Sequence, residues 1–376
     1  MNGWKLSENI IRLRREKKIT QEELADFVGV TKASVSKWEN SQSMPDILML
    51  PRLAAFFNVS VDALIGYEPQ LGREQIQKIY QELAADFAGK PFEETMEKCR
   101  SLVKQYYSCY PFLFQMGVLW LNHFMLAKDQ EQQREILEEA SGLCSHILAE
   151  CKDIGLCSDA VILRAQMDLL LGRVQEVVET LEETVNPYRL SGQSDGILIQ
   201  AYQLAGQKEK ADDFTQISMF LHLMNLAADA VWYLELHKDE LEICEETIRR
   251  MDEMFRIYGM ERLNANTAAQ FQLQAAVVYS LHGRKAEALE RLRQYADTIR
   301  WMLDGDHLTQ HGDHYFHRIS DWYEGCDLGG RAPRDKKLVS GSALQAFAHP
   351  AFAAFAEEPG FQRIRRSLEE QVASGE

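Results

Sequence analysis

The chain has 376 residues, of which 46% are hydrophobic and 26% charged, and its formal net charge is -16 at pH 7. A chain of this length can bury the cores of two or three domains, so its stability does not require disulfides or structural metals. The seven cysteines are odd in number and include no CxxC pair, which argues against a disulfide framework and a zinc ribbon. The first residues, MNGWKLSENIIRLRREKK, lack the apolar run of a signal peptide, and we therefore expect a cytoplasmic protein.

The charge is unevenly distributed along the chain. Residues 1–67 carry nine Lys or Arg against eight Asp or Glu, a net charge of +1. Residues 68–376 carry 32 Lys or Arg against 49 Asp or Glu, a net charge of -17. Two regions with different electrostatic roles are therefore expected.

The pattern of residues 1–67 predicts five short helices. Thr20, with Glu23 three residues later, forms a capping box before the second helix, QEELADFV, which ends at Gly29. Thr31 caps the third helix, KASVSKWEN, and two more follow in ILMLPRLAAFF and VDALIG. Two short helices joined by a turn with a glycine, inside a compact bundle, indicate a helix-turn-helix.

The third helix has two different faces. At roughly 100 degrees per residue, one arc of about 140 degrees carries Lys32, Ala33, Ser36, Lys37 and Asn40. Ser34, Val35 and Trp38 point the other way. Small residues permit close approach to DNA, and Lys reaches phosphates or guanine acceptors, so the first face fits a DNA groove. An ordinary amphipathic surface helix is the alternative.

Residues 13–64 resemble the helix-turn-helix domain of regulators of the phage-repressor and xenobiotic-response-element type. The matching elements are LR in the first helix, TQEELA, GV with the following threonine, SVSKWEN, and LAAFFNVSVDAL. The resemblance implies a sequence-specific transcriptional regulator that binds duplex DNA as a dimer on a two-fold operator. It also implies a partly buried ion pair between Arg14 and Glu39.

The resemblance assigns roles to single residues. The implied DNA-binding set is Gln21, Thr31, Lys32, Ala33, Ser34, Ser36, Lys37 and Asn40. Gln21 matches a glutamine that contacts a backbone phosphate and supports the recognition helix, here the third helix. Lys32 and Lys37 match positions that face base edges. Ala33 replaces the glutamine of some members and offers only an apolar contact, so the operator sequence cannot be transferred. Many members have Gly where Ser41 stands, which leaves the left-handed end of the third helix in doubt.

The remainder of the chain is expected to be almost wholly helical. The segment EPQLGRE contains a proline and a glycine and indicates a linker at residues 68–74. Apolar residues then recur at helical spacing. We predict a helical array at residues 75–331 and C-terminal capping helices at residues 332–376.

Three segments of the array share a pattern: RAQMDLLLGRVQEVVETL, IQAYQLAGQKEKADDF and AAVVYSLHGRKAEALERL. Their glycines, Gly172, Gly206 and Gly283, are 34 and 77 residues apart, which leaves room for a divergent pair at Leu226–Met251. The pattern resembles tetratricopeptide repeats, and the tail, with HPAF and PGFQRI, resembles the segment that closes such arrays. The predicted fold is all-α: a five-helix helix-turn-helix domain followed by an α-solenoid of tetratricopeptide-like hairpins.

The combination of these two regions resembles the peptide-pheromone-sensing regulators of Gram-positive bacteria. There an extended peptide lies in the groove of the repeats, held by asparagines. The candidates in this chain are Asn122, Asn225, Asn264 and Asn266. The acidic charge would suit a cationic peptide, or it serves only solubility. A repressor or scaffold without an effector is the alternative, with the repeats used only for protein interaction.

One apolar stretch raises the possibility of a membrane span. Residues 105–127 contain no charged residue. Pro111, Gln115, Asn122 and His123 interrupt the stretch, and no second one follows, so a buried helix is expected.

A histidine-rich segment, DGDHLTQHGDHYFHRISDW, is the only hint of metal chemistry. It contains His307, His311, His314 and His317, with Asp306 and Asp313. On one helix the first three histidines would share a face and could bind zinc or iron in a metal-binding sensor. Gly312 would weaken such a helix, so a loop with solvated or packing histidines and no metal is expected. No catalytic motif accompanies it, so neither an enzyme nor a cofactor is expected.

Overall fold

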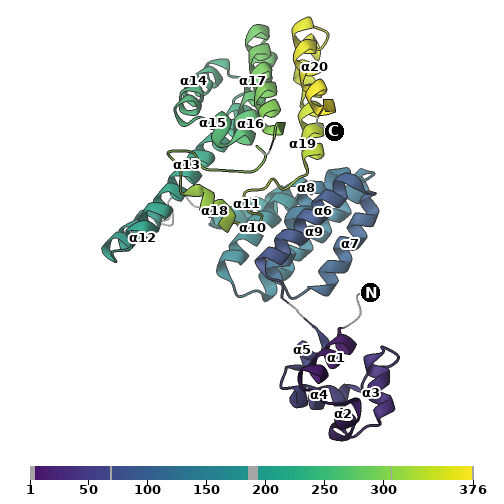
Figure 1. Ribbon diagram of the computed structural model, residues 1–376. Coiled ribbons are helices and arrows are strands. Elements are labelled where there is room, and N and C mark those ends of the chain that lie inside the picture. Colours follow the sequence, from purple (N-terminus) through teal and green to yellow (C-terminus); the bar gives the residue numbers. More distant parts are fainter. Residues whose placement is uncertain (1–4, 68–69, 185–193, 306, 375–376) are drawn as a thin grey trace. The chain divides into compact units, whose positions relative to one another are not determined.

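The computed structural model describes residues 5–67, 70–184, 194–305 and 307–374 (Figure 1). Within these residues the secondary structure is helical and includes no strand, so the predicted all-α class is confirmed. The chain divides into two compact units, residues 1–72 with 101–112, and residues 73–100 with 113–376.

The first unit begins with a bundle of five α-helices. They are α1 (Leu6–Glu16), α2 (Gln21–Val28), α3 (Lys32–Glu39), α4 (Leu50–Phe57) and α5 (Val61–Ile65). Each helix contributes a fully buried side chain to one core: Ile10, Leu24, Val35, Leu53 and Leu64. Burying an aliphatic side chain of this size stabilises a fold by about 1.5–3 kcal/mol, so this core can hold the bundle together.

The region before α4 differs from the single helix predicted there. A 3-10 turn, Ile47–Met49, comes first, and Asp46 caps it by accepting a hydrogen bond from the N–H of Leu48 at 2.9 Å. Pro51 then lies in the first turn of α4, where its missing N–H costs no helical hydrogen bond. The proline therefore sets the start of a helix instead of kinking one.

The second unit contains most of the remaining helices. In chain order these are α6 (Arg73–Gly89), α7 (Phe92–Gln105), α8 (Tyr110–His123), α9 (Gln130–Glu150), α10 (Ile154–Leu170), α11 (Val174–Thr184), α12 (Ser194–Leu204), α13 (Lys208–Leu236), α14 (Leu241–Tyr258), α15 (Met260–Leu263), α16 (Ala265–Leu281), α17 (Lys285–Leu303), α18 (Ile319–Gly325), α19 (Lys336–Gln345) and α20 (Pro359–Ser374). The turn of α7 into α8 belongs to the first unit. Residues 73 and 74 of the predicted linker are helical, and residues 68 and 69 lie outside the described part.

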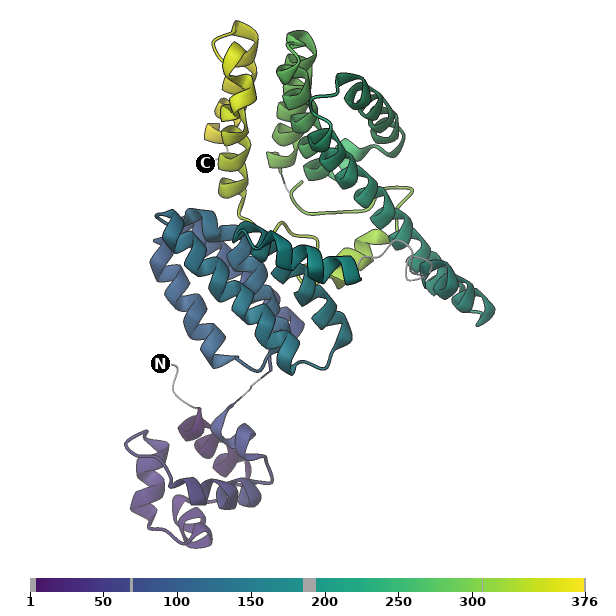
Figure 2. The same cartoon turned by 180° about the vertical axis from the view of Figure 1, so that it is seen from behind.

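Glycines turn three helical hairpins, as the sequence predicts. Gly172 joins α10 to α11, Gly206 joins α12 to α13, and Gly283 joins α16 to α17, with φ of +79°, +71° and +68°. The predicted divergent pair is formed by the second half of α13 and by α14, which pack together (Figures 1 and 2). Residues 237–240 turn it without a glycine, and α13 runs for 29 residues.

The apolar stretch at residues 105–127 contains the buried helix α8, as expected, together with the end of α7 before it and a 3-10 turn, Phe124–Leu126, after it. Leu113, Met116 and Leu119 of α8 are fully buried. Among the described residues one helix, α13, is long and apolar enough to cross a membrane, with a mean hydropathy of 1.3 in its most apolar window. A single such helix is a weak indication, because core helices pass the same test, and Phe220 and Leu234 of α13 lie in the core.

The C-terminal segment packs on the helices before it. Phe347, Phe352, Phe355 and Phe361 are buried in the same core as α16 and α17. Helix α20 packs along α17. The aromatic residues of HPAF and PGFQRI therefore serve packing.

Residues 324–334, here called the strap, follow from the end of α18 and bind side chains of α6 and α8. Arg73 and Gln77 donate to the carbonyl oxygen of Cys326 at 2.6 and 3.2 Å, Tyr80 donates to that of Pro333 at 3.2 Å, Arg331 donates to Gln81 at 2.7 Å, and Gln115 donates to Asp327 at 2.8 Å. The strap thus connects the later part of the second unit to α6 and α8, which come early in it.

Candidate nucleic-acid interface

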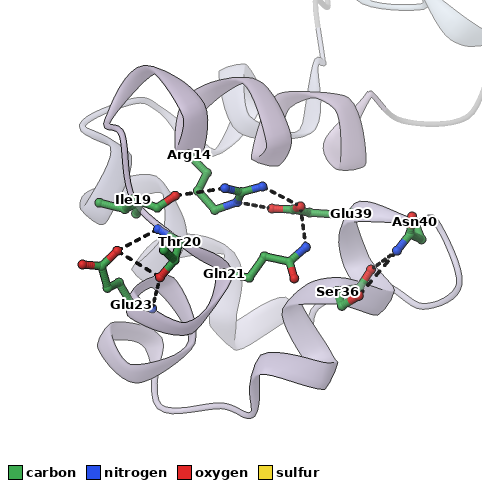
Figure 3. Close-up of polar contacts among 8 residues, drawn as sticks. All are labelled: Arg14, Ile19, Thr20, Gln21, Glu23, Ser36, Glu39 and Asn40. Carbon is green, nitrogen blue, oxygen red and sulfur yellow. Dashed lines mark hydrogen bonds and ion pairs between the residues drawn. The ribbon is translucent and has the colours of Figure 1, made fainter.

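Local hydrogen bonds set the start of α2 and of α3. Thr20 Oγ1 accepts from the N–H of Glu23 at 3.2 Å, and the Glu23 carboxylate accepts from the N–H of Thr20 at 2.7 Å, so the predicted capping box is confirmed (Figure 3). Gly29 ends α2 in the left-handed region, with φ of +80°. Thr31 Oγ1 then accepts from the N–H of Ser34 and caps α3. The turn between the two helices follows directly from these residues.

The two predicted faces of α3 are present. Val35 is fully buried and Trp38 is 6% exposed, and both belong to the core of the bundle. The residues of the opposite face are solvent-accessible: Lys32, Ala33, Lys37 and Asn40 are exposed and Ser36 is half-buried. The N-cap Thr31 is exposed, and Ser34, predicted on the other side, is half-buried. One side of α3 therefore anchors the helix, while the other presents cationic and small polar groups.

A buried carboxylate fixes α3 to α1 and α2. Arg14 donates from Nε to Glu39 Oε1 at 2.6 Å and from Nη2 to Oε2 at 3.0 Å, and it also bonds the carbonyl oxygen of Ile19 (Figure 3). The predicted ion pair is thereby confirmed, with side-chain exposures of 15% for Arg14 and 6% for Glu39. Gln21 Nε2 adds a third bond to Glu39 Oε2 at 2.8 Å. Three donors from two helices thus hold the end of α3.

The electrostatics of this cluster follow from its bonds. Burial raises the pKa of Glu39, but the hydrogen bonds from Arg14 and Gln21 and the charge of Arg14 outweigh it, so the pKa lies below its usual value. The bond to Glu39 in turn raises the pKa of Arg14. The pair is therefore charged on both sides at neutral pH.

The structure shows one of the two roles that the resemblance implies for Gln21. Its bond to Glu39 supports α3. An amide nitrogen carries two hydrogens, so this bond leaves the second for a phosphate oxygen. The phosphate contact itself remains a prediction.

The end of α3 is left-handed without a glycine. Asn40 donates from Nδ2 to the carbonyl oxygen of Ser36 at 2.8 Å. Ser41 has φ of +55°, and its hydroxyl donates to that of Ser7 at 3.0 Å. The doubt about this turn, which arose from the missing glycine, is thus removed.

Three apolar side chains after α3 were missed by the sequence analysis. Met44, Ile47 and Leu48 are 68%, 76% and 76% exposed. Ile47 and Leu48 lie in ILMLPRLAAFF, which was predicted as one helix, and Met44 lies just before it in SMPD, where the proline signals that the chain is still turning.

The four candidate effector asparagines occupy different settings. Asn122 donates to the carbonyl oxygen of Val118 within α8 at 2.9 Å, and Asn264 caps α16 by accepting from the N–H of Thr267 at 3.1 Å. Asn225 and Asn266 are exposed on α13 and α16. Local helix contacts account for the first two, so an effector role for the set remains a prediction.

The histidine-rich segment is a loop that leads into α18. The His307 ring stacks on Trp301 at 4.1 Å between centroids, and His317 Nδ1 lies 3.3 Å from Gln216 Nε2. Within the described residues, which exclude Asp306, no group of three His, Cys, Asp or Glu side chains could hold a metal ion. His311 and His314 line a pocket instead.

Comparison with known proteins gave matches to DNA-binding regulators. Residues 10–64 match the model of the family described as Helix-turn-helix. The HTH-type transcriptional activator BcrR of Enterococcus faecalis is 32% identical over 80 residues, 20% of this chain and 39% of that protein. The SPbeta prophage-derived uncharacterized HTH-type transcriptional regulator YonR of Bacillus subtilis is 31% identical over 88 residues, 23% of this chain and 82% of that protein. The uncharacterized HTH-type transcriptional regulator YqaE of the same species is 29% identical over 93 residues, 24% of this chain and 80% of that protein.

These matches have a limited extent. Each covers less than a quarter of this chain, and the chain spans 39% of the length of BcrR. No solved structure matches the chain.

Proposed function

Because the chain belongs to the family of HTH-type transcriptional regulators, we propose that residues 1–67 bind duplex DNA with α3 in the major groove. The observation that carries the proposal is that α3 has one buried apolar face and one exposed cationic face. Val35 and Trp38 are buried, while Lys32 and Lys37 project from the opposite face. A helix fixed by its apolar side and cationic on its outer side fits the groove of a polyanion.

Within this interface, the residues divide by the part of DNA they reach. Lys32, Ala33 and Lys37 face base edges, and the apolar Ala33 suits a thymine methyl group. Gln21, Thr31, Ser34, Ser36 and Asn40 contact the backbone or border it. Lys32 Nζ also lies 3.3 Å from Glu22 Oε2, but both side chains are more than 60% exposed, so this pair yields readily to a phosphate.

We further propose that the helical remainder serves dimerisation and effector sensing in the cytoplasm. The three hairpins turned by left-handed glycines support a tetratricopeptide-like array, because such units bury a continuous core only by stacking on neighbours. A dimer would place two copies of α3 on successive turns of one face of an operator. The net charge of -17 in residues 68–376 would keep this part away from DNA.

The test is a binding assay on duplexes that the full-length protein selects from a random-sequence pool. Changing Lys37→Ala should weaken binding about tenfold and relax base preference, since one base contact is worth roughly 1–3 kcal/mol. Gln21→Ala should weaken binding to all duplexes alike. The control is Lys78→Ala, which removes another exposed lysine, on α6, and should leave the affinity unchanged.

Two results would contradict the DNA interface. The first is a selection that enriches no duplex. The second is a Lys37→Ala protein that binds as tightly and as selectively as the Lys78→Ala control. Sedimentation of the complex would test the dimer separately, because a monomer bound to a two-fold duplex would contradict only that part.

A further inference from the structure

A pocket lies in the C-terminal half of the second unit, away from α3 in the sequence. Its volume is about 370 Å³, which is within the range of small-molecule sites. It is formed by α15, the end of α17 and the histidine-rich loop. The lining residues include Arg262, Trp301, His307, His311, Asp313 and His314.

The cationic group of this pocket is held in place by aromatic contact. The Arg262 guanidinium carbon lies 4.4 Å from the centroid of the Trp301 ring. Trp301 also stacks on His307, with an angle of 11° between the rings, and His307 Nδ1 is 2.9 Å from the carbonyl oxygen of Trp301. Within the described residues, which exclude Asp306 of this loop, the contact of the Arg262 guanidinium is this one with Trp301, and no carboxylate pairs with it. Its N–H donors are therefore positioned and uncommitted.

The carboxylate of the pocket does not neutralise this arginine. Asp313 Oδ1 accepts from the main-chain N–H groups of Tyr315 at 2.8 Å and Phe316 at 2.6 Å, so it caps the turn that leads to α18. What remains facing the pocket is a guanidinium with the imidazoles of His307, His311 and His314. Among the described lining residues, Arg262 is the one Arg or Lys and Asp313 the one carboxylate, and Oδ1 of Asp313 is occupied by main-chain N–H groups.

We propose that this pocket binds a small molecule that carries a carboxylate or phosphate group, with Arg262 as its principal anchor. A guanidinium matches the two oxygens of such a group, and bonds of this kind are about twice as strong as neutral ones. The pocket therefore favours an anionic ligand, in contrast to the cationic peptide that the overall charge suggested.

The histidine-rich loop is hydrogen-bonded to the strap. Gln310 donates its main-chain N–H to the carbonyl oxygen of Gly330 at 2.6 Å. A Cβ atom on Gly330 would lie 2.6 Å from the carbonyl oxygen of Gln310, so only glycine permits this approach. The strap in turn bonds Arg73, the first residue of α6, which follows the link from the helix-turn-helix bundle. A ligand that moves the loop therefore acts, through the strap, on the helix that follows the DNA-binding region in the chain, a consequence that rests on the proposed function.

Isothermal titration of the full-length protein tests the site directly. Citrate is the probe for carboxylates and phenyl phosphate the probe for phosphate esters, with phenol as the neutral comparison. We expect one of the two anions to bind with one-to-one stoichiometry and phenol not to bind. Arg262→Ala should weaken that binding at least about tenfold, since a charge-assisted bond is worth roughly 1.5–3 kcal/mol. The affinity of Arg262→Lys for the anion should lie between those of the native protein and of Arg262→Ala, because lysine keeps the charge but lacks the planar guanidinium.

The matched control is Arg249→Ala on α14. Arg249 is also an exposed arginine, but it pairs with Glu246 and lies outside the lining of this pocket. The proposal is overturned if neither anion binds, if Arg262→Ala has no effect, or if Arg249→Ala weakens binding as much as Arg262→Ala does. The last result would show general attraction to a charged surface.

A second measurement separates the site from its regulatory role. The operator affinity of the full-length protein should change on addition of the anion that binds, and this response should be lost in Arg262→Ala. If the titration succeeds while operator binding is absent, the site stands and the proposed function fails. If operator binding is intact and does not respond to the anion, the link through the strap is wrong.

Discussion

At the scale of single residues, Glu39 connects three helices of the first unit. Its carboxylate accepts two hydrogen bonds from Arg14 of α1 and one from Gln21 of α2. Because it lies at the last residue of α3, one side chain fixes the angle of the helix proposed to read DNA. A buried pair of this kind adds little net stability compared with apolar packing, but removing one partner leaves the other charge buried.

Replacing Glu39→Ala should therefore destabilise the helix-turn-helix bundle by about 3 kcal/mol, since Arg14 would lose its partner in a site with 15% exposure. Urea unfolding of a fragment of residues 1–67, followed by far-ultraviolet circular dichroism, would measure the change. Glu16→Ala is the control, because its carboxylate is 57% exposed in its pair with Arg12 and should change stability by less than about 1 kcal/mol. Equal effects of the two substitutions would contradict the buried role of Glu39.

The pH dependence of stability should carry the signature of the same carboxylate. The pKa of Glu39 is lower in the folded state than its usual value, so its contribution is present above about pH 4.5 and is lost as the pH falls through the folded pKa. The difference in unfolding free energy between the native protein and Glu39→Gln should therefore shrink between about pH 5 and pH 3. Using this difference removes the parallel effect of Glu23, whose pKa is lowered by its bonds to Thr20. A difference that grows on acidification would contradict the assignment.

At the scale of elements, the sequence predicted a helix boundary where a capping residue or a glycine marks it, and predicted it only approximately elsewhere. Thr20, Thr31 and Gly29 predicted the boundaries of α2 and α3, because a cap is a bond between residues three or four apart. The turn from α13 to α14 was placed only approximately, since no glycine or proline marks residues 237–240. Because no glycine or proline marks this turn, the sequence also did not predict that α13 is 29 residues long.

The glycine turns allow a matched test at this scale. Gly283→Ala should destabilise the second unit by about 1 kcal/mol or more, because φ of +68° is unfavourable for a residue with a Cβ atom. Gly142→Ala, in the middle of α9, should stabilise it by about 0.5–1 kcal/mol through helix propensity. A Cβ atom meets nothing within 4 Å at either position, so the backbone angle alone separates them. Thermal unfolding would measure both, and equal signs would contradict the explanation.

At the scale of the whole molecule, the predicted boundary after residue 67 has an experimental test. The core of the bundle uses only residues between Leu6 and Ile65, so a fragment of residues 1–67 should fold cooperatively and remain helical by circular dichroism. It should bind the selected duplex more weakly than the full chain if the remainder supplies the dimer contact. A fragment of residues 75–376 should be helical and should not bind DNA. An unfolded 1–67 fragment would contradict the boundary.

Long-range features of the molecule had no signal in the sequence. The strap is held mostly by main-chain carbonyl oxygens, which every residue has, so no residue pattern marks Cys326 or Pro333 as partners of α6. The pocket at Arg262 combines a short helix, α15, with loop residues from His307 onward, 45 or more residues after Arg262 in the chain. The sequence left a metal site open only as the alternative to packed or solvated histidines, and it could not show that the fold brings His307, His311 and His314 into the lining of a pocket with an arginine.

The bonds between the strap and α6 can form only late in synthesis on the ribosome. These bonds join α6 to residues 249 to 253 positions later in the chain. Synthesis of that length takes roughly 12–50 s at about 5–20 residues per second, whereas helical bundles fold in microseconds to milliseconds. The helix-turn-helix bundle therefore finishes folding long before α6 receives its last partners. During that interval each new molecule has a formed DNA-binding bundle whose adjoining helix is not yet held by the rest of the chain.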